Sequence, residues 1–278
     1  MYRILSAMIH DRGMLRTGVV VVACATVLRR LQKLSITWAK RKANHGRAVL
    51  SPDETGAHAF VLKSSKGVQL YCRRWGSPDN PTAAFIFVHG ELLSGSAFQK
   101  LAEKLTPRGY VCYAIDLTGF GKSGWQQGVQ SHIAHSSDYL DDLSTIVDFA
   151  KLNTGNAPVI LYGEGLGATC CLAFDLIEAN KNKVATIIAT SARLKPTITV
   201  DRVEHGFYGL LGRLIPTLPG PREQTARNIT DLFADPEIGM EAEINFEKYC
   251  LEMSSPAVLN FSLWNLVCNR HLSRRSKR

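Results

Sequence analysis

From residue 59 onward, short apolar runs alternate along the chain with segments of helical spacing. The runs 59–64 and 68–75 alternate apolar and polar residues around a Ser-Lys-Gly turn, which predicts a β-hairpin. The run 83–90 is almost wholly apolar and predicts a strand that is buried on both faces of a sheet. Three further strands are predicted at 111–117, 159–163 and 184–190.

The segments between these runs predict helices. Apolar residues recur at helical spacing over 96–109, 136–153 and 166–180. Strands that alternate with helices in this way predict an α/β fold with a mostly parallel sheet and helices on both faces. Such sheets bind ligands at the carboxyl ends of their strands, so we expect functional residues there. The residues at those ends are His89, Gly90, Asp116 and the turn from Gly163 to Gly167.

The alternation stops near residue 196. Four prolines interrupt the chain between 196 and 221, and no further strand is predicted after them. The segments 225–253 and 255–270 have the spacing of helices. We therefore divide the chain into an N-terminal segment (1–51), an α/β core (52–195), a helical region (196–268) and a C-terminal tail (269–278).

The N-terminal segment combines an apolar run with a basic amphipathic pattern. The run 17–28 has 12 residues, whereas a helix that spans a membrane needs about 20. Leu28, Leu31, Leu34 and Trp38 then recur at helical spacing among basic residues. This pattern favours a membrane anchor or interfacial helix and therefore a membrane-associated protein. An import peptide for the mitochondrion or another organelle is the second interpretation, and a secretory signal cleaved near Ala23-Cys24-Ala25 is the third.

Charge and cysteine content narrow the function classes. The 278 residues are enough for one large α/β domain, and the net charge is +9. This charge is concentrated at the ends, because residues 1–50 carry +9, residues 270–278 carry +5 and the middle carries −5. Basic ends suit an anionic membrane surface better than a nucleic acid, which we exclude as a partner. The seven cysteines include no C-x-x-C pair, so we expect reduced, buried thiols, no metal site and no cofactor.

The segment from Val159 to Phe174 reads as an apolar strand, a glycine-rich turn and a helix. This is the shape of the G-x-S-x-G turn that exposes the nucleophilic serine of a serine hydrolase. Here the turn is Gly163-Glu164-Gly165-Leu166-Gly167, so the outer glycines are present and the serine is replaced by Gly165. The same glycines match a dinucleotide-binding fingerprint only loosely. They also follow a late strand rather than the first one, which argues against nucleotide binding.

Together, a strand that ends in His89-Gly90, a strand that ends in Asp116-Leu117 before a Gly-x-Gly-x-Ser turn, and this glycine turn resemble the α/β-hydrolase superfamily. The resemblance is to its monoacylglycerol lipase branch, the serine aminopeptidase-like hydrolases, and it covers residues 58–268. It implies an elbow serine that attacks an ester carbonyl and an oxyanion hole of two backbone N–H groups. By position these donors are Glu91 and Leu166. It also implies that region 196–268 is a helical cap over an acyl pocket.

The sequence departs from this pattern in two ways. Gly165 has no side chain, so no alkoxide and no acyl-enzyme can form there. The family's last two strands, which carry the catalytic Asp and His, have no counterpart after the cap-like region, so we expect a fold truncated after the cap. His205 and His271 are the only histidines after the elbow, and we interpret both as surface residues. We interpret Ser94, Ser96 and Ser123 as helix-capping or turn residues, and Cys170 and Cys171 as packing residues.

Three hypotheses follow from these departures. The first is a catalytically inactive pseudoenzyme that binds a lipid or acyl ligand, or a protein partner that the sequence does not identify. The second is an active serine ester hydrolase that acts on monoacylglycerol-type lipids and of which this sequence is an incomplete or variant form. The third is a membrane or assembly factor that uses the fold only as a scaffold.

Overall fold

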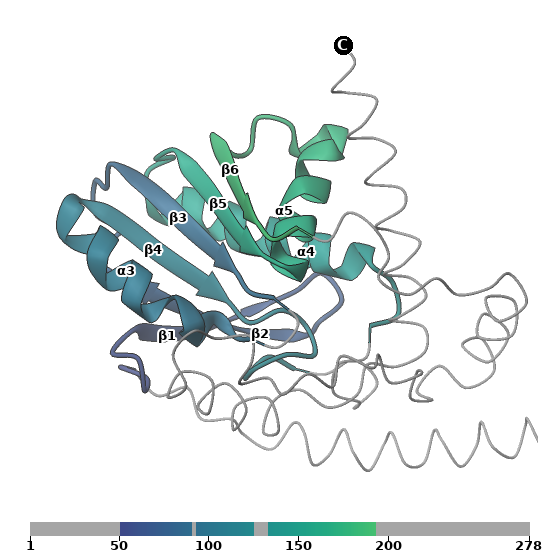
Figure 1. Cartoon of the computed structure of the whole chain (residues 1–278), viewed down its shortest axis with the longest axis horizontal. Coiled ribbons are helices and arrows are strands. Elements are labelled where there is room, and N and C mark those ends of the chain that lie inside the picture. Colours follow the sequence, from purple (N-terminus) through teal and green to yellow (C-terminus); the bar gives the residue numbers. More distant parts are fainter. Residues whose placement is uncertain (1–50, 91–92, 125–132, 193–278) are drawn as a thin grey trace, which may run out of the picture.

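A computed structural model describes residues 51–90, 93–124 and 133–192 (Figure 1). Within them, six strands form one sheet in the order β1-β2-β4-β3-β5-β6. The strands are β1 (His58–Lys63), β2 (Gln69–Trp75), β3 (Ala83–Val88), β4 (Tyr110–Ile115), β5 (Val159–Glu164) and β6 (Thr186–Thr190). The predicted hairpin is present, since β1 and β2 are antiparallel and β2 pairs antiparallel with β4. The pairs β3–β4, β3–β5 and β5–β6 are parallel, which confirms the mostly parallel sheet.

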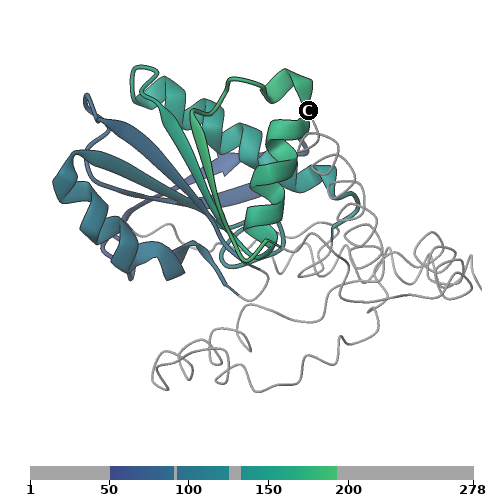
Figure 2. The same cartoon turned by 45° about the horizontal axis from the view of Figure 1, so that its top comes forward.

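Helices cover both faces of this sheet, as predicted. Helix α3 (Gln99–Leu105) lies on one face, and α4 (Ser137–Asn153) and α5 (Leu166–Leu176) lie on the other (Figures 1 and 2). The short 3₁₀ helices are η1 (Gly95–Phe98), η2 (Thr106–Arg108) and η4 (Glu178–Asn180). The described residues therefore form an α/β fold with a mostly parallel sheet between two layers of helices.

Two apolar cores follow from the alternation of side chains along the buried strands. Ile86, Leu161 and Cys170 belong to the larger core, which fills the space between the sheet and α4 and α5. Phe87 and Phe98 belong to the smaller core, which lies under α3. Successive residues of β3 thus serve different cores, because neighbouring side chains of a strand point to opposite faces.

Most predicted elements differ from the structure by one or two residues at an end, and three of these differences have a clear cause or are larger. The helix predicted over 96–109 is divided into η1, α3 and η2, and it stops at Gly109, which has a left-handed φ of 83° that glycine adopts at low cost. The helix predicted over 166–180 ends at Leu176, because Ile177 is extended, and η4 follows. The last strand begins at Thr186, two residues later than predicted.

The described residues contain no helix that is both long and apolar enough to cross a membrane. The N-terminal segment (1–51) lies outside them except for Ser51. The cap-like region (196–268) and the basic tail (269–278) lie wholly outside them. The expectations for these three segments are therefore proposals.

Candidate functional site

The predicted site residues that follow β3, β4 and β5 lie together at the carboxyl ends of these strands. The strands β3, β4 and β5 run parallel, so their carboxyl ends lie side by side. His89 follows β3, Asp116 follows β4 and Gly165 follows β5. Gly90 lies next to the elbow, since a Cβ atom on it would be 3.5 Å from the carbonyl oxygen of Glu164. Glu91, the expected second oxyanion donor, lies outside the described residues.

Gly165 forms the apex of the turn between β5 and α5. Its backbone has φ 54° and ψ −114°, a region that residues with a Cβ atom rarely adopt. Its N–H donates to the carbonyl of Thr190 at 3.0 Å, and its carbonyl accepts from the N–H and the Oγ1 of Thr169, both at 3.2 Å. The apex is therefore held by hydrogen bonds to β6 on one side and to the first turn of α5 on the other.

The two outer glycines of the elbow are required by close packing. A Cβ atom on Gly163 would lie 2.5 Å from the carbonyl oxygen of Gly167. A Cβ atom on Gly167 would lie 2.1 Å from the carbonyl oxygen of Val88 in β3. Both distances are far below van der Waals contact, so α5 can approach the sheet only if both positions are glycine. Leu166, the other expected oxyanion position, is buried at the start of α5, and Glu164 ends β5 partly exposed.

His89 is buried and positions the loops rather than serving as a base. Its Nε2 atom accepts a hydrogen bond from the N–H of Leu117 at 3.0 Å. The proton must therefore lie on Nδ1, which donates to the carbonyl of Gly90 at 2.6 Å. The ring also packs edge-on against Phe120 at 5.4 Å between centroids. Both ring nitrogens thus join backbone groups that follow β3 and β4.

Asp116 is likewise a positioning residue. Its Oδ1 atom accepts from the N–H of Gly95 at 2.7 Å and from Nη1 of Arg73 at 2.8 Å. Its Oδ2 atom accepts from the N–H of Lys122 at 2.8 Å. The carboxylate therefore ties η1 and the loop after β4 to the sheet, and it is fully buried.

The sequence alone does not reveal that Asp116 forms an ion pair with a buried arginine. Arg73 lies in β2 with only 1% of its side chain exposed, and its Nε atom donates to Asp53 at 2.7 Å. Burial alone would raise the pKa of Asp53, but hydrogen bonds from Thr55 and the charge of Arg73 outweigh it and lower that pKa. The only sequence signal was a basic pair in a strand, Arg73-Arg74, which is more often a sign of a solvated face.

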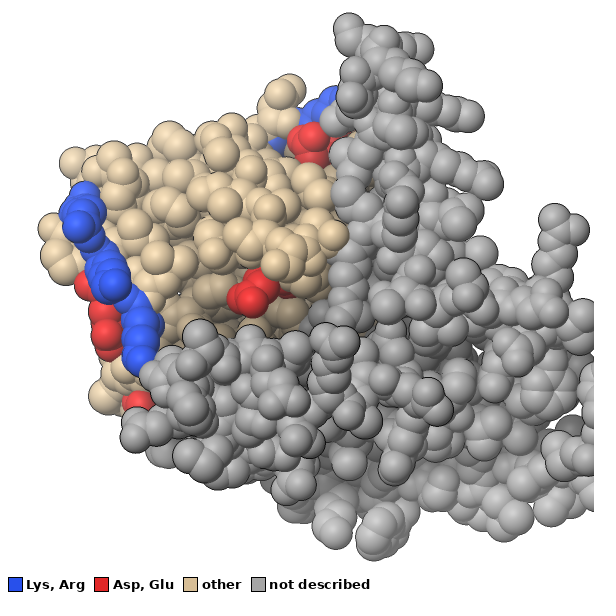
Figure 3. Space-filling view, viewed as in Figure 1, with Lys and Arg blue, Asp and Glu red and all other residues tan. Residues whose placement is uncertain are grey.

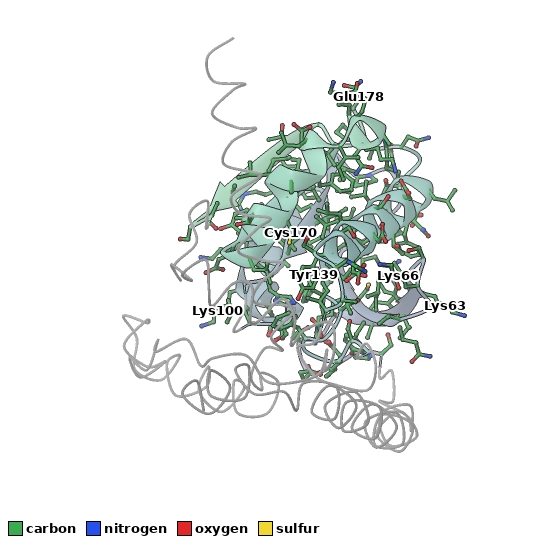
Figure 4. The ribbon with its side chains drawn as sticks, turned by 90° about the vertical axis from the view of Figure 1, so that its right-hand side faces the viewer. Lys63, Lys66, Lys100, Tyr139, Cys170 and Glu178 are labelled. Carbon is green, nitrogen blue, oxygen red and sulfur yellow. The ribbon has the colours of Figure 1, made fainter. Side chains whose placement is uncertain are left out.

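A second buried carboxylate, also missed, lies behind the site on α4. Asp142 accepts a hydrogen bond from the N–H of Thr118 at 2.9 Å and so holds the chain just after β4. Burial raises its pKa to about 7, the charges of Asp138 and Asp141 add to this effect, and hydrogen bonds from Thr118 oppose it. Asp138 itself pairs with Lys66, which lies in the hairpin turn and is labelled in Figure 4.

The serines and cysteines of the region have structural surroundings. Ser94 stands at the N-cap position of η1 without a side-chain capping bond, since its hydroxyl bonds that of Ser96 at 2.7 Å. Its carbonyl accepts from the N–H of Ala97 at 3.1 Å, so of the two predicted roles it has that of a turn residue. Ser123 accepts from the N–H of Tyr71 at 2.8 Å and donates to the carbonyl of Asp116, in keeping with a turn residue. Cys170 and Cys171 are fully buried, and burial raises the pKa of the Cys171 thiol (Figure 4).

This arrangement presents a rigid backbone turn without a nucleophilic side chain at its apex. Among the residues that the structure describes, no group of three or more His, Cys, Asp or Glu side chains could hold a metal ion. His205 and His271 lie outside these residues. What remains at the sheet edge is a partly exposed Gly165 at the start of a helix.

A family model described as serine aminopeptidase, S33, matches residues 79–242, which include all of these strand ends. The chain belongs to this S33 family of hydrolases. Among curated S33-like relatives, the monoacylglycerol lipase of Mycolicibacterium smegmatis is 22% identical over 55% of this chain and 53% of its own length. The monoglyceride lipase of Rattus norvegicus is 24% identical over 51% of this chain and 52% of its own length. The chain spans about half the length of these relatives.

Solved structures agree with the S33 assignment at the level of the fold. A lipase in its open form is similar with a TM-score of 0.60 and 16% identity, covering 77% of this chain and 74% of the lipase. A soluble variant of the monoglyceride lipase from Saccharomyces cerevisiae, in complex with a substrate analogue, has a TM-score of 0.59 and 14% identity. It covers 79% of this chain and 72% of that lipase. Identities this low show a shared fold alone.

Proposed function

We propose that this chain is a monoacylglycerol lipase-like member of the S33 family that binds an acyl lipid without hydrolysing it. The observation that carries this proposal is Gly165 at the apex of an otherwise complete elbow. Hydrolysis through an acyl-enzyme needs a side-chain oxygen or sulfur that attacks the carbonyl carbon. Glycine offers neither, and loss of the nucleophile from a triad removes most of its catalytic power.

His89, Asp116 and the two cysteines of α5 are not available as a substitute nucleophile or base. Both nitrogens of His89 are bonded to backbone groups, and both oxygens of Asp116 accept hydrogen bonds from backbone N–H groups. Cys170 and Cys171 are fully buried. A reaction at Gly165 would have to draw its reacting groups from other residues.

The class of ligand is proposed from the family and from the apolar surroundings of the elbow. Relatives at 22% and 24% identity are named monoacylglycerol lipase and monoglyceride lipase. Leu166, whose N–H the family resemblance assigns as an oxyanion donor, begins a helix whose buried residues are mostly apolar. The positive end of the helix dipole stabilises the partial negative charge of a carbonyl oxygen at this position. This stabilisation does not require that the carbonyl be attacked. A chain that no longer hydrolyses the lipid can therefore still bind it.

Attachment to a membrane is a separate part of the proposal. The basic amphipathic segment that includes Arg29, Arg30 and Lys33 would bind anionic lipid headgroups, each basic residue contributing about 1 kcal/mol near such a surface. Flotation of the full chain with phosphatidylcholine vesicles, with and without phosphatidylserine, tests it. We expect binding that needs phosphatidylserine and falls when these three residues are changed to Gln. Equal flotation with both vesicle types would show that the basic residues do not drive binding, and no flotation with either type would contradict attachment and leave the import peptide as the better interpretation.

The decisive experiment treats the full chain with a fluorophosphonate probe and separately with a monoacylglycerol ether that carries a photoreactive diazirine. The ether cannot be hydrolysed, so it reports binding alone. We expect no fluorophosphonate label, and diazirine cross-links in peptides from 89–90 or 163–176 that excess 1-O-oleylglycerol removes and glycerol does not. A fluorophosphonate adduct on a serine would overturn the proposal in favour of an active hydrolase. Absence of competed cross-links would leave the scaffold hypothesis.

A further inference from the structure

The outer face of α3 carries three cations in one row. Lys100, Lys104 and Arg108 follow one another at intervals of four residues across α3 and η2, and all three are exposed. Residues four apart lie on one face of a helix, so the row extends along the helix for about 12 Å. Figure 3 shows Lys and Arg atoms in such a row along the border of the molecule where Figure 1 places α3. Lys100 points away from the ribbon (Figure 4).

Packing on the inner face of α3 fixes the direction of this row. Ala102 is buried and Leu105 is partly buried against the smaller core, which contains Phe87 and Phe98. These apolar contacts hold α3 on the sheet, so the opposite face of the helix is directed outward. The row is therefore a fixed feature of the folded core and does not depend on a chain end for its position.

Helix stability accounts for only part of the row. Lys104 and Arg108 lie near the C-terminal end of the helix, where cations interact favourably with its dipole. Lys100 lies in the first turn of α3, where a cation opposes the dipole. The carboxylate of Glu103, beside the row, accepts from the amide of Gln99 rather than from one of the three cations. Three cations and one acid leave this face with a net charge of +2.

We propose that this row is a contact of the folded core with an anionic membrane surface. Residues 51–269 carry a net charge of −5, so such a surface repels most of the core and attracts it where cations gather. Each Lys or Arg near an anionic membrane strengthens binding by about fivefold. The row therefore orients the core on the membrane, whereas the basic N-terminal segment tethers the chain to it.

A membrane is favoured over an acidic protein as the occupant because the chain has a second basic segment. Residues 28–38 have the pattern of an interfacial helix, and two contacts on one chain reinforce each other when both reach the same surface. The contact of each with headgroups is electrostatic, so it requires anionic lipids and weakens with salt.

The row begins close to the end of the sheet that carries the elbow. Helix α3 follows η1, whose Gly95 donates its N–H to Asp116 directly after β4. Lys100, in the first turn of α3, is therefore the cation of the row that lies nearest to the carboxyl ends of the strands. A membrane on this row lies near the place where we propose that the acyl lipid binds. The inference goes beyond that proposal, since contact with headgroups does not require a bound acyl lipid.

The test is co-sedimentation of the full chain with phosphatidylcholine vesicles, with and without phosphatidylserine. A row variant that combines Lys100→Gln, Lys104→Gln and Arg108→Gln should bind the phosphatidylserine vesicles at least about tenfold more weakly than wild type. If it binds them as tightly as wild type does, the proposal is overturned, and the row is a solvated face or a surface for an acidic protein. Circular dichroism checks that the variant folds as wild type does.

The matched control removes the same charge from other parts of the core. Lys63 ends β1, Lys151 lies on α4 across the sheet from α3, and Lys181 follows η4. A variant that changes these three residues to Gln should bind phosphatidylserine vesicles within about twofold of wild type, because electrostatic attraction falls off within a Debye length. An equal loss in the row variant and this control overturns the proposal, since net charge alone then explains both.

A further variant separates the row from the N-terminal segment. Changing Arg29, Arg30 and Lys33 to Gln leaves the row intact, so binding that requires phosphatidylserine should weaken and persist. Adding the three row substitutions should reduce it to the level seen with phosphatidylcholine alone. Failure of the N-terminal attachment is thus visible in one variant and failure of the row in another.

A second measurement needs no variant. Acetylation of the wild-type chain with a water-soluble N-hydroxysuccinimide ester, followed by mass spectrometry, reports how accessible each lysine is. Bound phosphatidylserine vesicles should protect Lys100 and Lys104 and leave Lys63 and Lys181 reactive. Equal reactivity of Lys100 and Lys104 in the free and the bound chain overturns the proposal, because the core then meets the membrane with another face.

Discussion

The guanidinium of Arg73 in β2 lies between the carboxylates of Asp53 and Asp116, 2.7 and 2.8 Å away, and is closed off from solvent. This buried ion group joins three segments that are far apart in sequence: the chain before β1, strand β2 and the loop after β4. Because Asp116 also holds Gly95, the group reaches the segment that follows β3. Buried ion pairs as well as apolar packing therefore hold the segments at the carboxyl ends of the strands, where the elbow lies.

Removal of Arg73 should therefore be costly. Arg73→Leu leaves two buried carboxylates without their counter-charge, and breaking such a group typically costs about 3–5 kcal/mol of unfolding free energy. Denaturant titration followed by circular dichroism measures this loss. The neighbouring Arg74 is a matched control, since its Nε atom has no hydrogen-bond partner in the described residues, and Arg74→Leu should cost much less. If both variants lose a similar unfolding free energy, only the apolar part of the Arg73 side chain stabilises the fold and its ion pairs do not.

Restoring a serine at the elbow should carry a structural cost and no activity. Gly165→Ser places a Cβ atom on a backbone with φ 54°, a strain of about 1–3 kcal/mol. We expect the free energy of unfolding to fall by that amount and hydrolysis of p-nitrophenyl esters to stay at the wild-type level. Gly165→Ala separates the two effects, because it has the same backbone strain and no hydroxyl. Ester turnover by Gly165→Ser above that of Gly165→Ala would mean that a base and an acid are already in place.

Gly167 in the elbow should tolerate a larger side chain far less than Gly90, which follows β3. A methyl group on Gly167 would enter the carbonyl of Val88, whereas one on Gly90 would reach only ordinary contact at 3.5 Å. We expect Gly167→Ala to lower the free energy of unfolding by more than about 3 kcal/mol or to prevent folding, as overpacking against a fixed backbone does. Gly90→Ala should stay within about 1 kcal/mol of wild type. Thermal unfolding of both variants checks the order.

The raised pKa of Asp142 predicts that its contribution to stability falls as the pH rises. Burial raises its pKa from 3.8 to about 7, so the folded protein holds a proton that the unfolded chain releases. Its contribution is complete below pH 4 and is lost as the pH rises to about 7, at no more than about 1.4 kcal/mol per pH unit. Asp142→Asn keeps an oxygen for the N–H of Thr118 and does not titrate. Its stability relative to wild type should therefore rise between pH 4 and pH 7 and then level off. If the difference in stability between Asp142→Asn and wild type stays flat over this pH range, the buried carboxylate does not take up a proton on folding.

The sequence was sufficient where apolar periodicity decides the structure. The strands β3 and β4 could be located because they are buried on both faces and therefore read as unbroken apolar runs. The elbow could be located because close packing allows only glycine at two of its positions. Arg73 and Asp142 could not be identified in this way. A charged residue in a strand or helix usually faces water, and only the tertiary structure brings these two to their buried partners.

Helix ends were harder to predict than strands. Ser94 stands where a capping serine is expected, yet its hydroxyl turns to Ser96 because η1 is a short 3₁₀ turn rather than a full helix. The end of α5 at Leu176 had no glycine or proline to mark it, since the chain becomes extended at Ile177. Local signals set such ends only weakly, whereas the apolar faces of the same helices were evident.

Gly163 and Gly167 show how a reaction and a fold can be inherited separately. The close contact of α5 with β5 depends on Gly163, and its close contact with β3 depends on Gly167, whereas neither depends on the residue between them. A lineage could therefore exchange the central residue without reshaping the turn, so selection for folding alone would preserve the appearance of a catalyst. In such proteins the backbone of the elbow indicates the family, whereas only the side chain at its apex indicates whether the reaction can occur.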